Sequence, residues 1–287
     1  MSLAWFNQGY YIHCAANQYI KEERMTDQAV LNPYSAPTSQ VETVSSNDSV
    51  VFCSAKKLTA GQGNRIVADA WKIYKTAPFK WTFINFSLYA LLLIISLIPI
   101  LGTFVGSLFY TPLFAGLLIA ASEIENGGAL KFSHLFAGIK RNAKGVFGLA
   151  ISITLLSLIN MALAFWFLGG EYFMAMFAGQ DIDPETLNMN PQNLLLGMMV
   201  MLVGTAFFMM LTWFATPLIA LQSVGVFQAM SMSFKACLKN WLALTIYGFV
   251  MAFWMIVAVI PVGLGLFILL PLLSITIYTS YRKVFTQ

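Results

Sequence analysis

The side chains best placed to bind a metal ion lie in one acidic segment, where Asp181, Asp183 and Glu185 alternate along the chain. Calcium-binding loops space their oxygen ligands in a similar way, but an EF-hand also needs a central glycine and a later glutamate. This segment has neither, so the calcium interpretation is weak. Asp183 followed by Pro184 is instead typical of a helix start, with aspartate as the N-cap. We therefore expect a solvated acidic loop that contains a short helix.

No other group of residues predicts a catalytic, cofactor-binding or metal site. Glu123 and Glu125 are two positions apart, so on a helix they face different directions and do not form an acid–base pair. The cysteines Cys14, Cys53 and Cys237 are widely spaced and follow no metal-binding or redox pattern. We expect free, reduced thiols. We also expect no enzymatic activity and no cofactor, because an enzyme needs a placed nucleophile, base or metal.

Long apolar runs occupy most of the chain from about Trp81 to Tyr281. Of its 287 residues, 59% are apolar and 10% are charged, whereas a soluble domain has about a quarter charged residues. The runs divide into six segments of about 20 residues, the length that crosses a bilayer as a helix. The predicted fold is therefore an all-α polytopic membrane domain of residues 61–287 with six transmembrane helices. The predicted spans are residues 81–98, 103–121, 146–168, 194–221, 241–260 and 262–281.

The basic residues predict how these spans are oriented. All sixteen Lys and Arg residues fall on one side of the topology, and that side includes both ends of the chain. The opposite side carries a loop at about residues 169–193, which holds Glu171 and the acidic segment and has no basic residue. Positively charged loops stay in the cytoplasm. We therefore predict that the N- and C-termini are cytoplasmic and that this loop is external.

Three units along the membrane domain share one layout. Each has a short amphipathic helix followed by a hairpin of two spans, so we predict three pseudo-repeated hairpins. The apolar residues of the short helices recur at the spacing of one helix face. These residues are Ile66, Val67, Ala70, Trp71 and Tyr74, then Phe132, Leu135, Phe136 and Ile139, then Phe227, Met230, Phe234, Cys237 and Leu238. Such helices either lie in the lipid interface or pack against the bundle as connectors.

Each short helix also places basic residues beside its apolar face, and His134 is expected on the polar face of the second helix. Basic residues near the inner leaflet attract anionic headgroups by about 1 kcal/mol each. We therefore predict headgroup sites at three pairs and membrane lipids, anionic ones above all, as partners; alternatively, these charges only set the topology. Nucleic acid is not an expected partner, because no basic stripe stands clear of the membrane. The pairs are Lys72 and Lys75, Lys140 and Arg141, and Lys235 and Lys239.

A proline recurs inside the second span of each unit, at Pro112, Pro217 and Pro271. Proline removes one backbone hydrogen bond and kinks a helix. In membranes a neighbouring helix, water or a Ser or Thr hydroxyl can compensate for the loss. Thr111 and Thr216, which directly precede the first two prolines, are placed for that role. These kinks could form a hinge for transport, but we favour static kinks that shape helix packing.

Between their ends, the predicted spans contain no Asp, Glu, Lys, Arg or His. Ionisable groups at bilayer depth mark ion pathways and proton relays. Their absence argues against a proton- or sodium-coupled pump but not against a channel or a lipid pathway. Asn160, in the middle of a span, is the best functional candidate among the small polar residues. Its simpler role is an interhelical hydrogen bond, worth about 0.6 kcal/mol in membranes.

Residues 1–60 are polar and rich in turn-forming residues, and they show no periodic apolar face. This composition predicts a disordered cytoplasmic tail. Met25 is a second start-like position, and we expect the native protein to begin there. The alternative is that residues 1–24 form a real tail with an amphipathic start.

Four local segments show a shared pattern: Leu135-Phe136-Ala137-Gly138, residues 233–241, Pro261-Val262-Gly263-Leu264-Gly265 and Tyr278-Thr279-Ser280-Tyr281-Arg282. In these segments the chain resembles an uncharacterised family of bacterial six-span inner-membrane proteins, over about residues 61–285. Its layout is more distantly similar to that of membrane domains attached to glycerophosphodiesterases. The resemblance implies a Gram-negative inner-membrane location and a part in envelope maintenance. No phosphodiesterase domain is present in this sequence, so no catalytic residue is carried over.

The sequence is compatible with three functional hypotheses. The leading one is a non-enzymatic membrane protein that binds lipids or partner proteins and supports envelope integrity. The second is a transporter or channel for a neutral or lipidic molecule, which would use the kinked spans. An intramembrane enzyme is the least favoured, because the sequence lacks the groups that catalysis needs.

Overall fold

The computed structural model describes residues 55–98, 101–170, 178–179 and 190–286. Most of the predicted tail, with Met25, and most of the external loop, with Asp181, Asp183 and Glu185, lie outside the described residues. The chain divides into a large unit of residues 57–281 and a small unit of residues 1–56 and 282–287. In the small unit, the Lys56 amide donates a hydrogen bond of 2.8 Å to the Val284 carbonyl.

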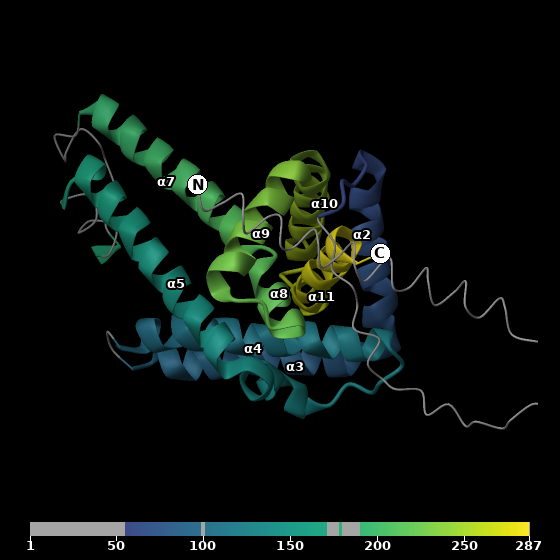
Figure 1. Ribbon diagram of the computed structural model, residues 1–287. Coiled ribbons are helices and arrows are strands. Elements are labelled where there is room, and N and C mark those ends of the chain that lie inside the picture. Colours follow the sequence, from purple (N-terminus) through teal and green to yellow (C-terminus); the bar gives the residue numbers. More distant parts are fainter. Residues whose placement is uncertain (1–54, 99–100, 171–177, 180–189, 287) are drawn as a thin grey trace, which may run out of the picture. The chain divides into compact units, whose positions relative to one another are not determined.

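Every regular element in the described part of the chain is a helix, which confirms the all-α class (Figure 1). The elements are α2 (Ala60–Thr76), α3 (Pro78–Ser96), α4 (Leu101–Glu125), η1 (Phe132–Phe136), α5 (Ala137–Leu168), α7 (Pro191–Thr212), α8 (Ala215–Gln222), α9 (Val226–Lys239), α10 (Trp241–Val259) and α11 (Leu266–Phe285).

Five helical segments of the described chain are long and apolar enough to cross a membrane, as a multi-pass membrane protein requires. The segment predicted as the sixth span forms α11, which is not among the five. Val262 and Gly263 adopt positive φ angles of 55° and 79°, so they form a turn and α11 starts only at Leu266. The five segments are Pro78–Ser96, Phe104–Glu125, Phe132–Leu168, Gln192–Gln222 and Trp241–Val259.

The second half of α4 forms the best-buried part of the core. All side chains from residue 111 to residue 121 are buried, among α3, η1, α5 and α8. Two glycines allow the close approach of η1 and α5 to this helix. A Cβ on Gly116 would overlap the carbonyl oxygens of His134 and Leu135, and one on Gly138 would overlap the Pro112 carbonyl. Small residues let membrane helices pack backbone against backbone in this way.

Helices α5 and α7 form an antiparallel pair (Figure 1) that leaves most of its apolar side chains exposed. A lipid environment accounts for this exposure, because apolar side chains facing hydrocarbon carry no hydration cost. Asn160 packs here against Gly204, where an added Cβ would overlap the Asn160 amide oxygen. Gly197 accommodates Leu168 in the same manner near the end of the pair. Asn160 therefore lies at a helix–helix contact.

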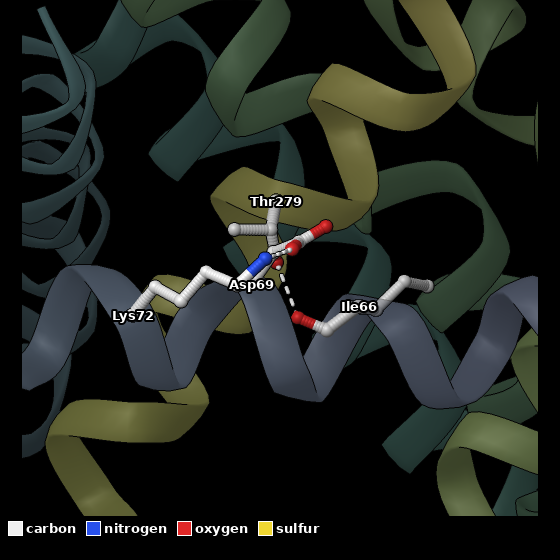
Figure 2. Close-up of polar contacts among 4 residues, drawn as sticks. All are labelled: Ile66, Asp69, Lys72 and Thr279. Atoms are coloured by element: carbon white, nitrogen blue, oxygen red, sulfur yellow. Dashed lines mark hydrogen bonds and ion pairs between the residues drawn. The ribbon is translucent and has the colours of Figure 1, made fainter.

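Side chains of α11 form hydrogen bonds to four surrounding helices. One of them, from the Thr279 hydroxyl to the Ile66 carbonyl of α2, is drawn in Figure 2. This lateral bonding needs polar side chains along α11, and these residues make the helix less apolar than the five spans. The bonds are Ser274–Asn85 on α3 (2.8 Å), Thr276–Tyr247 on α10 (2.7 Å), Tyr278–Glu125 on α4 (2.8 Å) and Thr279–Ile66 on α2 (3.0 Å).

The amphipathic helix α2 is present, and its buried face coincides with only part of the predicted apolar face. Ile66, Ala70 and Tyr74 are buried as expected, whereas Trp71 is 40% exposed and Ile73 is buried in its place. The reason is that α2 packs against α10, with Gly63 close to the backbone of that helix. The packing of α2 against α10 therefore leaves Trp71 exposed, although Trp71 belongs to the predicted apolar face.

The other two amphipathic helices also bury only part of their predicted apolar faces. The second is a short 3-10 turn, η1, continued into α5, which has a non-helical residue at Asn142. Of the apolar residues predicted there, Leu135 is buried while Phe132 and Phe136 are exposed. In α9, Phe227 and Leu238 are exposed, because the contacting face is a stripe of mostly small residues. That stripe comprises Ala229, Met230, Ser233, Ala236 and Cys237.

Hydroxyl groups from neighbouring helices satisfy backbone groups near two of the three prolines. Pro271 lacks the N–H that would bond the Phe267 carbonyl, and the Thr82 hydroxyl donates to that carbonyl at 3.1 Å. The helix is interrupted before Pro217, between α7 and α8. There the Ser233 hydroxyl accepts a hydrogen bond from the Phe214 amide and donates one to the Met210 carbonyl. The bridging hydroxyls thus come from α3 and α9, not from the predicted Thr216. Pro112 lies inside α4, which continues through it.

Candidate functional site

Polar and aromatic side chains meet where α3 begins, α4 ends and α5 begins. Gly127, with a φ angle of 83°, ends α4, and the Gly128 amide donates to the Glu123 carbonyl at 2.8 Å. The chain then reverses direction into η1, and buried Leu135 holds this short helix against α4. Two surface cavities flank the η1 region. They lie at the end of the spans that the charge pattern predicts to be cytoplasmic.

His134 is buried and links η1 to α4. Its Nε2 lies 2.8 Å from Oε2 of Glu123, and its Nδ1 accepts a hydrogen bond from the Lys131 amide at 3.2 Å. The Lys131 amide thus occupies Nδ1, which leaves Nε2 to donate to the Glu123 carboxylate. This geometry corrects the prediction that His134 lies on a solvent-facing polar surface.

The contacts of His134 bear directly on the enzyme hypothesis. A histidine base must offer a free nitrogen to the nucleophile or substrate that it deprotonates. Both nitrogens of His134 are already engaged, one by Glu123 and the other by the Lys131 amide. In this arrangement neither nitrogen of His134 is available to deprotonate the neighbouring Ser133.

The first cavity, which we call the polar cavity, has a volume of about 330 Å³. Its ionised side chains are the Glu123 carboxylate, the Lys140 ammonium and the Arg141 guanidinium. Arg141 also donates a hydrogen bond of 3.2 Å to the Leu221 carbonyl at the end of α8, which holds its guanidinium in place. The complete lining is Ile119, Glu123, Ser133, His134, Ala137, Lys140 and Arg141.

The second cavity, which we call the aromatic cavity, has a volume of about 350 Å³. Phe79, Phe83 and Phe132 line it while being 90%, 65% and 51% exposed, and the rings of Phe83 and Phe132 are 6.0 Å apart. Lys80 and Lys131 add two positive charges to this apolar surface. The complete lining is Phe79, Lys80, Phe83, Ile84, Leu130, Lys131 and Phe132.

Comparison of the chain with protein-family models, curated proteins and solved structures finds no match. The family resemblance drawn from local segments therefore stays a prediction. What the chain binds has to be argued from the geometry of its own residues.

Of the three predicted basic pairs, Lys140 and Arg141 line one of these two cavities together. Lys72 instead forms an ion pair with Asp69, with 2.9 Å between Nζ and Oδ1 (Figure 2). Lys75 on α2 is exposed outside both cavities. The third pair, Lys235 and Lys239, is likewise exposed on α9 and lines neither of them.

Sequence reasoning missed the aromatic cavity and its lysines, Lys80 and Lys131, as a joint site. The local signal was present, because Phe79, Lys80 and Phe83 follow Pro78 at the start of a span, where aromatic and basic side chains are common. Their partner Phe132 is about fifty residues further on, and only the packing of η1 beside α3 brings the two segments together.

Proposed function

We propose that this chain is a non-enzymatic, multi-pass protein of the bacterial inner membrane that binds an anionic phospholipid in the aromatic cavity. The observation that carries the proposal is the meeting of Lys80 and Lys131 with Phe79, Phe83 and Phe132 in one cavity. The lysines would hold the phosphate group. The exposed phenylalanine rings would contact the glycerol and the upper part of the acyl chains.

Simple energetics support this placement. Each basic side chain near an anionic leaflet contributes about 1 kcal/mol to headgroup attraction, and the attraction weakens with salt. The exposed Phe79 and Phe83 would otherwise contact water, so lipid contact supplies the apolar part of the affinity. Lysine stems can extend along the apolar surface while the ammonium group reaches the headgroup.

The finer topology belongs to the same proposal. We place both termini in the cytoplasm and count α11 as a sixth span, so that three pseudo-repeated hairpins each carry one of the matched prolines. The support is the charge asymmetry of the loops and the twenty-residue length of α11. A role in envelope integrity follows from the resemblance, through lipid or protein partners.

The orientation is tested with single cysteines replacing Lys140 and Gln180 in a cysteine-free variant. An impermeant thiol reagent added outside intact spheroplasts should label Gln180→Cys and leave Lys140→Cys unlabelled until the membrane is permeabilised. The opposite pattern would reverse the proposed topology.

Lipid binding is tested by measuring the lipid that stays with the purified protein. The variant Lys80→Gln/Lys131→Gln should retain several-fold less phosphatidylglycerol and cardiolipin than the wild type, since it loses about 1 kcal/mol per charge. Lys75→Gln/Lys144→Gln is the matched control, because it removes the same charge from exposed positions outside both cavities. Equal loss in the two variants, or no loss in either, would contradict the proposed site.

The transport alternative has less support from the structure. A hinge at a proline needs backbone groups that can exchange partners as the helix bends. Near Pro271 and Pro217 these groups are bonded to side chains of neighbouring helices. That arrangement favours static kinks, so we do not propose transport as a second function.

A further inference from the structure

The polar cavity contains charges of both signs, unlike the aromatic cavity. Glu123 contributes a carboxylate from α4, while Lys140 and Arg141 contribute cations from α5. A purely anionic ligand would be repelled by the carboxylate, and a purely cationic one by the two basic groups. The charges are therefore complementary to a ligand that carries an anionic and a cationic group side by side.

Glu123 has spare hydrogen-bonding capacity in this arrangement. Its contact with His134 uses Oε2, which lies 2.8 Å from Nε2 of the imidazole. A carboxylate offers about four acceptor positions, and His134 occupies one of them. The Glu123 side chain is 52% exposed, in contrast to 10% for His134, so an incoming donor can reach it.

The basic side of the polar cavity also has donors to spare. A guanidinium has five N–H donors, and the contact with the Leu221 carbonyl uses one nitrogen of Arg141. Because that contact fixes the side chain, less conformational entropy is lost when a ligand binds. Lys140 is exposed and directly precedes Arg141 in α5. A guanidinium next to an ammonium is suited to a phosphate group.

We propose that the polar cavity binds a phosphate ester that also carries a primary amine, of which the phosphoethanolamine headgroup is the simplest membrane form. The phosphate lies against Lys140 and Arg141, and the ammonium donates to Glu123. The volume of about 330 Å³ is at the lower end for small-molecule sites, which fits a headgroup and not a larger ligand. This site is separate from the aromatic cavity, so the inference goes beyond the proposed function.

The test uses the full chain carrying Lys80→Gln/Lys131→Gln, which removes the phosphate-binding charges of the aromatic cavity. This background protein is placed in nanodiscs with an otherwise neutral lipid, and three added lipids are compared. Phosphatidylethanolamine should bind more tightly than phosphatidylcholine, whose quaternary ammonium has no N–H to donate, and than phosphatidylglycerol, which has no amine. Glu123→Gln should abolish this preference while retaining an acceptor for His134. Lys140→Gln should weaken binding of all three lipids about fivefold, as expected for one lost charge near a membrane surface.

Lys144→Gln serves as the charge-matched control, because Lys144 is exposed on the same helix but lines neither cavity. Thermal unfolding of each variant shows whether it is folded. If the background protein does not discriminate by the amine, or if folded Glu123→Gln in that background discriminates equally well, the inference is wrong. Both outcomes are read without Lys80 and Lys131, so failure here is distinguishable from failure of the aromatic site.

A competition experiment separates the two sources of this chemistry. Soluble O-phosphoethanolamine is added to protein that holds phosphatidylethanolamine, with glycerol phosphate as the amine-free control. Displacement by the amine compound alone assigns the cavity to a free aminophosphate, and retention of the lipid assigns it to the headgroup. Equal displacement by both compounds would show that the amine is not recognised and would overturn the inference.

Discussion

The Ser233 hydroxyl accepts a hydrogen bond of 2.9 Å from the Phe214 amide. The same hydroxyl donates to the Met210 carbonyl at 2.8 Å. In an uninterrupted helix the Phe214 amide would bond that carbonyl directly, since the two residues are four positions apart. Ser233 is thus inserted into the hydrogen-bond ladder where α7 gives way to α8, just before Pro217. Side chains inserted in this way are a recognised cause of helix kinks.

Replacing Ser233 with alanine should destabilise the protein by about 1–3 kcal/mol, because the buried Phe214 amide would lose its acceptor. The change is measured as a lower unfolding midpoint in detergent. Ser231→Ala is the matched control, since Ser231 is exposed on the same helix and should have little effect. Equal stability of the two variants would show that the inserted hydroxyl contributes nothing.

Thr82 and Pro271 should show strong energetic coupling. Thr82→Val removes the donor to the Phe267 carbonyl and should cost about 1 kcal/mol in the natural background. In a Pro271→Ala background the same change should cost less, because alanine supplies the missing helical N–H. A double-mutant cycle on unfolding free energies measures the difference. Additive effects would contradict the role assigned to Thr82.

The two glycines Gly116 and Gly106 of α4 should respond oppositely to alanine. Gly116→Ala places a methyl group against the η1 backbone and should destabilise the protein by about 1–3 kcal/mol or more. Gly106 has no atom within 4 Å of an added Cβ, so Gly106→Ala should be neutral or stabilising by up to about 1 kcal/mol. Thermal unfolding in detergent compares them. A similar loss in both would contradict the packing explanation, because helix propensity favours alanine at both positions.

Cys237 should react very slowly with thiol reagents. Burial, partly offset by a hydrogen bond to Ser233, raises the pKa of its thiol to about 12. The reactive thiolate is then only about one part in ten thousand at pH 8, and its fraction should rise about tenfold per pH unit. A Cys14→Ser/Cys53→Ser variant isolates this thiol, and maleimide labelling with and without denaturant gives the rates. Fast labelling of the folded protein would contradict the burial of α9 on this face.

Several features of this protein could be read from local sequence. The apolar runs predicted helices that can cross a membrane, and five such segments are present. They could be predicted because length and hydropathy are properties of contiguous residues. The limit of this reasoning is visible at the turn before α11, where Val262 takes a left-handed conformation that apolar residues rarely adopt. Helix α11 consequently begins at Leu266, four residues after the predicted start of the span at residue 262.

The candidate sites were less accessible to sequence reasoning. The basic residues Lys140 and Arg141, predicted from sequence as a headgroup site, line a cavity together, and the site itself stays a prediction. In the sequence, their acidic counterpart Glu123 stands out only beside Glu125. Its contact with His134 depends on the reversal of the chain at Gly127 and Gly128. That reversal joins a predicted span to the amphipathic segment that follows it.

The amino-acid sequence alone thus determined the helical class and five segments that are long and apolar enough to cross a membrane. Tertiary structure alone decided that Ile73 and not Trp71 is buried in α2, and that Ser233 bonds the backbone before Pro217. It also decided that Phe132 lies beside Phe83. The physical reason is that hydropathy and charge act residue by residue. Which face of a helix is buried, and which hydroxyl meets which carbonyl, depend on contacts between segments far apart in the chain.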